Sequence, residues 1–129
     1  MIVLDASAAV CVVLDSPLDR AHRIKVRLQG EQLHSPHLID LEVANALRRL
    51  VQAGGLTAAR AAEALDDLAH LPLRRHPHLP FLVDIWRLRD NYTAYDAAYL
   101  TLAGVLDVPL ITLDVRMARA PSGASIEVF

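Results

Sequence analysis

Two short apolar runs in this chain end in the same way, on an aspartate. The first covers residues 2–4 and leads into Asp5 in the sequence IVLD, and the second covers residues 109–113 and leads into Asp114 in ITLD. Runs of this length are typical of buried parallel strands. Both aspartates are therefore predicted at the carboxyl edge of a parallel sheet, where open α/β sheets bind ligands. Each could instead simply cap the helix that follows it, a role worth about 1 kcal/mol.

The rest of the chain alternates short apolar runs with helical patterns, which predicts an α/β fold with a mainly parallel sheet. Strands are expected at residues 2–4, 32–35, 73–76, 109–113 and 125–128, and helices at 6–14, 17–29, 38–53, 57–70, 80–90 and 94–106. No repeat, low-complexity tract or linker interrupts this order. A single domain over residues 1–129 is therefore expected.

The amino-acid composition excludes several classes of protein. Hydrophobic residues make up 53% of the 129, which is ample for a core and leaves some for a partner surface, so a homodimer or a bound partner is expected. The lone Cys11 excludes an internal disulfide and a cysteine-rich zinc site. No apolar stretch is long enough for a membrane helix, and the N-terminus lacks a basic lead, so we expect a cytoplasmic protein without a membrane partner.

The formal net charge of −2 does not argue against a nucleic-acid substrate. If four of the 15 acidic residues are committed to a metal site, 11 remain against 13 basic residues, which leaves a formal +2 elsewhere. Basic side chains could then hold phosphates locally.

Two further acids lie within predicted helices. Glu42 falls beside the apolar stripe of its helix, together with Asn45 and Arg49. The solvent-exposed face of an ordinary surface helix would have the same pattern. Asp96 stands three residues after Thr93, the spacing of a capping box. Local physics can thus explain each acid alone. It does not explain why two acids at strand ends and two on helices could face one edge.

Gathered carboxylates raise one another's pKa and oppose folding unless a cation compensates them. Mg²⁺ and Mn²⁺ favour carboxylate and water oxygens, activate water and stabilise charge on a phosphate. A cluster of four carboxylates therefore predicts metal-dependent phosphodiester chemistry.

Four blocks of the sequence resemble the PIN-domain family, and within it the VapC-type toxins of bacterial toxin–antitoxin pairs. They are IVLDASA, LEVANALRRL, RLRDNYTAYDAAYLTLA and PLITLDVRMARA, in the expected order over essentially the whole chain. The resemblance implies a PIN-like three-layer sandwich, with a four- to five-stranded, mainly parallel sheet and helices on both faces. It also implies endonucleolytic cleavage of RNA and a cognate VapB-like antitoxin.

The resemblance also assigns residues. Asp5, Glu42, Asp96 and Asp114 correspond to the family's acidic residues, and Asp5, Asp96 and Asp114 are expected to bind metal. Ser7, Asn45 and Thr112 match polar positions that support them.

Some relatives carry a further acid shortly after the last aspartate, but here Val115, Arg116 and Met117 follow it. One firm Mg²⁺ or Mn²⁺ site is therefore expected, with a second that fills only when substrate binds.

The mechanism expected is in-line attack on phosphorus by a metal-activated water, oriented by Asp96 or Asp114, which leaves a 3′-hydroxyl and a 5′-phosphate. Arg49 and Arg116 are predicted near the acidic edge and could contact phosphate, although each could equally be a surface arginine. The antitoxin is expected to lay an apolar or basic segment near the early helices and to insert an arginine among the carboxylates.

Other chemistries fit less well. A receiver domain needs paired acids after the first strand and a lysine after a late strand, but Lys25 is the only lysine; a haloacid-dehalogenase-like phosphatase needs Asp-x-Asp, but Ser7 stands second. The pairs His34-x-x-His37 and His76-Pro77-His78 are assigned to proline-marked loops without a third metal ligand. Trp86 and the three tyrosines could stack on bases but are interpreted as packing residues.

The alternative that the sequence leaves open is a catalytically silent binding module, whose acidic pocket serves mainly to receive an antitoxin's arginine. The presence of all four acids favours an enzyme.

Overall fold

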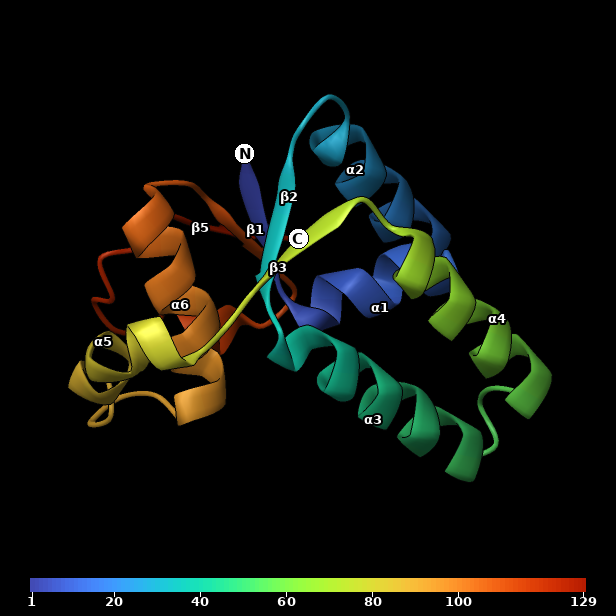
Figure 1. Ribbon diagram of the computed structural model, residues 1–129. Coiled ribbons are helices and arrows are strands. Elements are labelled where there is room, and N and C mark those ends of the chain that lie inside the picture. The colour runs from blue at the N-terminus through green and yellow to red at the C-terminus, as the bar shows by residue number, and fades with distance from the viewer.

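A five-stranded sheet forms the centre of the computed structural model, which describes all residues 1–129 (Figure 1). The strands are β1 (Ile2–Leu4), β2 (Leu33–Pro36), β3 (Leu73–His76), β4 (Leu110–Thr112) and β5 (Ile126–Val128). Their order in the sheet is β3-β2-β1-β4-β5, and every neighbouring pair is parallel. The prediction of a mainly parallel α/β sheet is confirmed.

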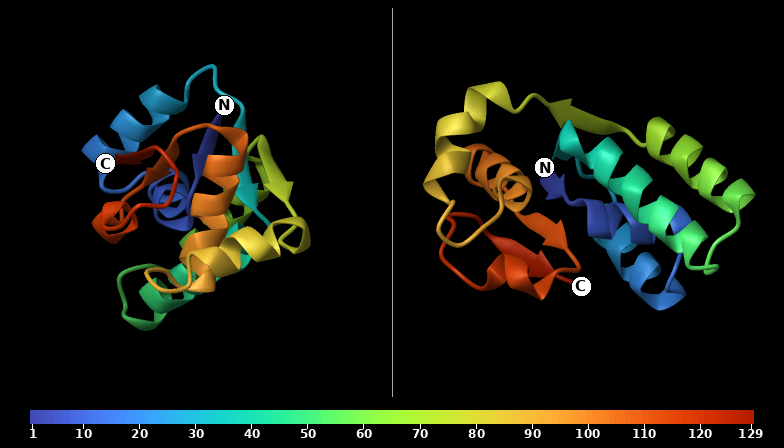
Figure 2. Two further views of the ribbon diagram at one scale, coloured as in Figure 1. Left: turned by 90° about the vertical axis from the view of Figure 1, so that its left-hand side faces the viewer. Right: turned by 90° about the horizontal axis from the view of Figure 1, so that it is seen from below.

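Helices cover both faces of this sheet. They are α1 (Ala6–Leu14), α2 (Leu18–Leu28), α3 (Leu38–Gln52), α4 (Ala58–His70), α5 (Leu82–Arg87) and α6 (Ala94–Leu106), with 3₁₀ turns η1 (Leu79–Phe81) and η2 (Val115–Ala118). Helices α1–α4 pack together on one face, and α5 and α6 lie on the other, as Figure 1 and the right-hand view of Figure 2 show. None of these helices has the length and apolar character needed to cross a membrane.

The order of the strands explains this division and locates the site. From central β1 the chain runs outward to β2 and β3, and then returns to the other side of β1 for β4 and β5. Right-handed crossovers place the helices of these two halves on opposite faces. The strand order reverses between β1 and β4, and at such a switch point the loops leave the carboxyl ends in opposite directions and open a crevice. Asp5 and Asp114 follow these two strands.

The core explains why the two central strands read as unbroken apolar runs. All residues of β1 and β4 are buried, since helices cover both of their faces. Helix α6 is buried from Ala97 to Ala103 and is apolar around most of its circumference, as expected for a helix inside a domain. The residues just before this buried stretch, including Asp96, lie at the carboxyl edge of the sheet.

The predicted boundaries hold for most elements, with two corrections. The helix expected at residues 80–90 is wrong in extent, because the chain forms the 3₁₀ turn η1 first and α5 ends at Arg87. Buried Tyr92 donates its hydroxyl to the carbonyls of Met117 and Ala120 at 3.0 and 2.7 Å, which holds the following loop away from a continued helix. Strand β2 includes Pro36, where the pairing with β1 has already ended at His34.

A further correction concerns the histidines assigned to loops. His34 lies within β2, only 4% exposed, and His76 ends β3. His34 Nδ1 is 2.8 Å from His76 Nε2, and the rings stack with centroids 5.1 Å apart. Burial lowers the pKa of both imidazoles; nearby Arg74 lowers both further, and His34 and His37 add to the effect at His76. The pair is therefore neutral in the folded protein at pH 7.

This pair should make the folded protein sensitive to mild acid. Because both pKa values are lowered by folding, the unfolded chain takes up protons first as the pH falls below about 6.5, and the stabilisation present above that pH is lost as the pH falls through the lowered values. Urea unfolding at pH 7.5, 6.5 and 5.5 should show a steeper loss of stability for the wild type than for His76→Gln. His22→Gln, exposed on α2, is the control and should keep the wild-type slope. Equal slopes for His76→Gln and the wild type would contradict the prediction.

Candidate active site

The four predicted acids line one pocket of about 500 Å³. They come from four parts of the fold: Asp5 follows β1, Glu42 lies on α3, Asp96 on the first turn of α6, and Asp114 caps η2 after β4. The residues that complete the lining are Ala6, Ser7, Val10, Asn45, Ala46, Arg49 and Tyr99. The site that the sequence suggested is thus a single cavity at the carboxyl edge of the sheet.

Asp5 is the most buried of the acids, with 6% of its surface exposed. One carboxylate oxygen accepts hydrogen bonds from the Ser7 hydroxyl at 2.7 Å and from the backbone N–H of Ala8 at 2.9 Å, and the other accepts from the Thr112 hydroxyl at 2.5 Å. The bond from Ala8 makes Asp5 the N-cap of α1. Capping and pocket lining are therefore both roles of this one side chain.

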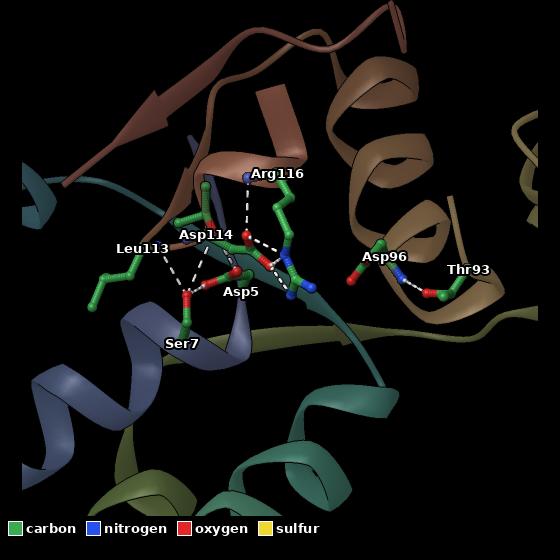
Figure 3. Close-up of polar contacts among 8 residues, drawn as sticks. Asp5, Ser7, Thr93, Asp96, Leu113, Asp114 and Arg116 are labelled. Carbon is green, nitrogen blue, oxygen red and sulfur yellow. Dashed lines mark hydrogen bonds and ion pairs between the residues drawn. The ribbon is translucent and has the colours of Figure 1, made fainter. Parts of the chain in front are cut away.

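Ser7 and Thr112 also bond the chain that leaves β4. The Ser7 hydroxyl accepts from the N–H of Leu113 at 2.9 Å (Figure 3). The Thr112 hydroxyl accepts from the N–H of Asp114 at 2.9 Å. Both residues were predicted to support the acids, and the structure places both in contact with Asp5. Burial still raises the pKa of Asp5, although these hydrogen bonds oppose the rise.

Glu42 lines the pocket from α3 and has a partner that the sequence did not reveal. The hydroxyl of Tyr99 donates to Glu42 Oε2 at 2.6 Å. Burial raises the pKa of Glu42, the Tyr99 bond lowers it, and nearby Asp96 raises it. Interpreting Tyr99 as a packing residue was therefore incomplete: the ring is 2% exposed, but its hydroxyl belongs to the site. Its position one helical turn after Asp96 was the available signal.

The other aromatic residues that were interpreted as packing residues differ in their burial. Tyr92 is buried, as predicted, whereas Trp86 is 67% exposed and Tyr95 62% exposed. These two belong to the surface and not to the core.

Asp96 makes only one of the two hydrogen bonds of a capping box. The Thr93 hydroxyl accepts from the N–H of Asp96 at 3.2 Å, but the return bond of a capping box, from the Thr93 N–H to the Asp96 carboxylate, is not made. The carboxylate instead faces the pocket (Figure 3). Burial raises the pKa of Asp96, with a further rise from Asp114.

Asp114 is the one acid of the pocket whose pKa is lowered, because Arg116 is bound to it. The guanidinium approaches both carboxylate oxygens, with Nη2 at 2.6 Å from Oδ2 and Nε at 2.9 Å from Oδ1. The backbone N–H of Arg116 also donates to Oδ1 at 2.9 Å. Arg116 was predicted near the acidic edge as a possible phosphate contact, and the structure places it on an acid.

Asn45 and Arg49 line the pocket from α3, beside Glu42. Neither makes a hydrogen bond with the four acids; Asn45 Oδ1 is 3.5 Å from Arg48 Nη1. Arg49 lowers the pKa of Glu42 through its charge alone. Both side chains are exposed and so remain available to a ligand entering the pocket.

The carboxylates of the pocket are the kind of ligand that a hard divalent cation binds. Mutual repulsion runs through the site, since Glu42 raises the pKa of Asp5, Asp96 that of Glu42, and Asp114 that of Asp96. A divalent cation relieves such repulsion and prefers carboxylate oxygens. No three acidic, histidine or cysteine side chains are arranged as a ready metal-binding group. The pairing of Asp114 with Arg116 takes one carboxylate out of such a group.

Comparisons with known proteins agree on one family. The model of the PIN domain matches residues 2–122. Ribonuclease VapC1 from Mycobacterium tuberculosis is 49% identical over 120 residues, which cover 92% of this chain and 90% of that protein. Ribonuclease VapC9 from the same organism is 41% identical over 118 residues, which cover 92% and 89%.

Solved structures agree with the fold. The crystal structure of PAE2754 from Pyrobaculum aerophilum has a TM-score of 0.71 at 27% identity and covers 97% of this chain and 89% of its own. VapBC2 from Rickettsia felis, solved bound to a DNA fragment from its promoter, has a TM-score of 0.70 with 98% of each chain covered; at 12% identity it supports the fold alone.

Removing one charge from the pocket should stabilise the metal-free protein. Because the pKa of Glu42 is raised on folding, its negative charge opposes folding near neutral pH, and Glu42→Gln keeps an oxygen for Tyr99 while removing that charge. In EDTA at pH 7.5 the melting temperature of this variant should rise by about 4 °C for each kcal/mol relieved. The gain should shrink as the pH falls through the raised pKa of Glu42, because the wild-type side chain then takes up a proton.

The matched control is Glu63→Gln on α4, whose side chain is 72% exposed and pairs with Arg60 at 3.7 Å. Its effect on stability should stay within about 0.5 kcal/mol. A Glu42→Gln protein that melts below the wild type in EDTA would contradict the electrostatic explanation.

Proposed function

This chain belongs to the PIN-domain family, and within it to the VapC ribonucleases; from that premise we propose that it is a metal-dependent endoribonuclease and the toxin of a toxin–antitoxin pair. The observation that carries the proposal is the meeting of Asp5, Glu42, Asp96 and Asp114, from four separate elements, in one pocket. Four carboxylates in a cavity are unfavourable for stability alone. Their gathering is the arrangement expected of a site for Mg²⁺ or Mn²⁺.

Asp5 and Asp96 are the residues proposed to hold the cation, with Glu42 beside them and Asp114 added when its pairing with Arg116 opens. The two hydroxyls and one N–H on Asp5 fix its carboxylate before any ligand arrives. A bound Mg²⁺ or Mn²⁺ would supply positive charge that stabilises the phosphate during attack and acidifies a water.

Asp96 is the better placed of the two carboxylates considered as the group that orients the attacking water. Arg116 holds both oxygens of Asp114, whereas the carboxylate of Asp96 lines the pocket and no cationic side chain is bound to it. The oxygens of Asp96 are therefore more accessible to a water beside the cation. The water would attack phosphorus as the bond to the 3′ oxygen breaks, and the proton would pass to that oxygen, leaving a 3′-hydroxyl and a 5′-phosphate.

RNA would enter over α3 and η2. Arg49 and Asn45 line the same pocket as the acids and are exposed, so they are placed to contact a phosphate or a 2′-hydroxyl next to the scissile bond. Basic groups beside an acidic site let a chain with net negative charge bind a polyanion locally.

The ribonuclease activity should depend on the buried acids and on the cation. Purified protein with structured RNA and Mg²⁺ or Mn²⁺ should cleave the RNA, and Asp5→Asn or Asp96→Asn should lower the rate by roughly 100-fold or more, because several kcal/mol of charge stabilisation is lost. Asp90→Asn, whose side chain is 82% exposed, should cleave at the wild-type rate. Gel analysis of end-labelled RNA, with EDTA as a further control, measures this.

Cleavage at the wild-type rate by Asp5→Asn would contradict the assignment of this pocket as the catalytic site. The absence of any metal-dependent cleavage by the wild type would favour the silent binding module.

The antitoxin partner and the homodimer are also proposed. The antitoxin would lay an apolar or basic segment near the early helices and place an arginine against the carboxylates. A homodimer would cover apolar side chains that this chain leaves exposed. The largest group of them lies on η1 and α5, where Leu79, Leu82, Val83 and Trp86 are 54–79% exposed.

The mass of the assembly tests both partners. Light scattering after size exclusion should give twice 14.2 kDa for the chain alone and a larger complex when it is co-expressed with the antitoxin encoded beside it. Trp86→Glu should shift the chain alone toward the monomer, whereas Val105→Glu, 54% exposed on α6, should not. A wild type that elutes as a monomer in both experiments would contradict the two partner proposals.

A further inference from the structure

The ion pair between Asp114 and Arg116 is the one place where a cationic side chain of this protein binds an acid of the pocket (Figure 3). Three donors of Arg116 reach the carboxylate: Nη2, Nε and the backbone N–H. Both oxygens of Asp114 are engaged by the guanidinium, at 2.6 and 2.9 Å. A divalent cation that used Asp114 would have to take an oxygen from Arg116.

The charge of Arg116 extends beyond its partner. Figure 3 shows the guanidinium between the carboxylates of Asp114 and Asp96. Its charge lowers the pKa of Asp96, and the charge of Asp96 raises the pKa of Arg116. A guanidinium there offsets part of the repulsion that a bound cation would otherwise relieve. Arg116 and a divalent cation therefore have the same electrostatic role on this side of the pocket.

The arginine is held loosely enough to exchange. Its side chain is 67% exposed and that of Asp114 24%, and an exposed ion pair of this kind contributes little to stability. A phosphate offers a guanidinium the same two-pronged contact that a carboxylate does. RNA lying over the pocket could draw Arg116 away from Asp114.

We propose that Arg116 is an internal counter-ion that competes with a divalent cation for Asp114, so that this side of the pocket binds metal fully only when RNA phosphate takes over the guanidinium. The proposal rests on the ribonuclease function above and gives a physical basis for a second metal position that fills with substrate. Arg116 is a positioning residue in this account, because it acts through Asp114.

Calorimetric titration with Mn²⁺ tests the competition without any reaction. Arg116→Gln should bind Mn²⁺ roughly five- to tenfold more tightly than the wild type, or show a second site, because one competing charge and its hydrogen bonds are gone. Arg116→Lys keeps the charge but loses the two-pronged contact, and should lie between the two proteins. Thermal unfolding checks that each variant is folded.

Arg119→Gln is the matched control. Arg119 follows in the same segment and also lowers the pKa of Asp114 through its charge, but it makes no hydrogen bond to that carboxylate. Its Mn²⁺ affinity should stay within about twofold of the wild type. Equal affinity and stoichiometry in the wild type and Arg116→Gln would overturn the proposal, as would an equal gain in Arg119→Gln, which would indicate net charge alone.

A second titration tests the role of RNA. An oligoribonucleotide with methylene groups in place of its 3′ bridging oxygens has no P–O3′ bond to lose. It should raise the Mn²⁺ affinity of the wild type, and should raise that of Arg116→Gln much less, because the variant has no guanidinium to release. An equal rise in both proteins would overturn the release step.

The outcomes separate this inference from the function on which it rests. If the wild type and Arg116→Gln bind Mn²⁺ equally while cleavage still depends on Asp5, only the counter-ion role is wrong. If neither protein binds Mn²⁺ and neither cleaves RNA, the metal-dependent ribonuclease itself is wrong.

Discussion

The carboxylate of Asp5, buried at the end of the central strand, sets the requirement that the surrounding structure meets. A buried charge left without partners costs several kcal/mol, so the groups that satisfy it must all be in place together. Those groups come from the start of α1 and from the end of β4, and two of them also bond the chain after β4. Pairing of β1 with β4, the start of α1 and the shape of the pocket therefore form as one unit.

The other three acids show how one cavity can hold four carboxylates before any cation arrives. Each has a different compensation: Glu42 has the hydroxyl of Tyr99, Asp96 has partial exposure and the field of Arg116, and Asp114 has Arg116 itself. These compensations are incomplete, since the pKa values of Asp5, Glu42 and Asp96 all stay raised. The repulsion that remains lowers the stability of the metal-free protein. A bound cation would restore that stability.

Sequence was a sufficient guide wherever the signal was local. The apolar runs before Asp5 and Asp114 locate two strands and their shared edge, and the glycine and threonine boundaries locate α3 and α4. It failed for contacts made across the fold. Tyr99 and Glu42 are 57 residues apart, and His34 and His76 are 42 apart, so nothing near either member identifies its partner. The shortened α5 has the same origin, because Tyr92 is anchored by residues about 25 positions later.

An acidic pocket of this kind selects for cations in general, and three kinds compete for it under the functions proposed here: a divalent metal ion, the chain's own Arg116, and an arginine from the antitoxin. They differ in what they can reach. Arg116 is held by its short connection to Asp114, two residues away, and its charge reaches only Asp114 and the neighbouring Asp96. An arriving arginine therefore meets like charges on both sides of the pocket, from Arg116 at η2 and from Arg49 on α3. It would have to bind at the acids between them, next to Asp5, where the cation required for catalysis would also bind, so the antitoxin and the metal ion would exclude each other.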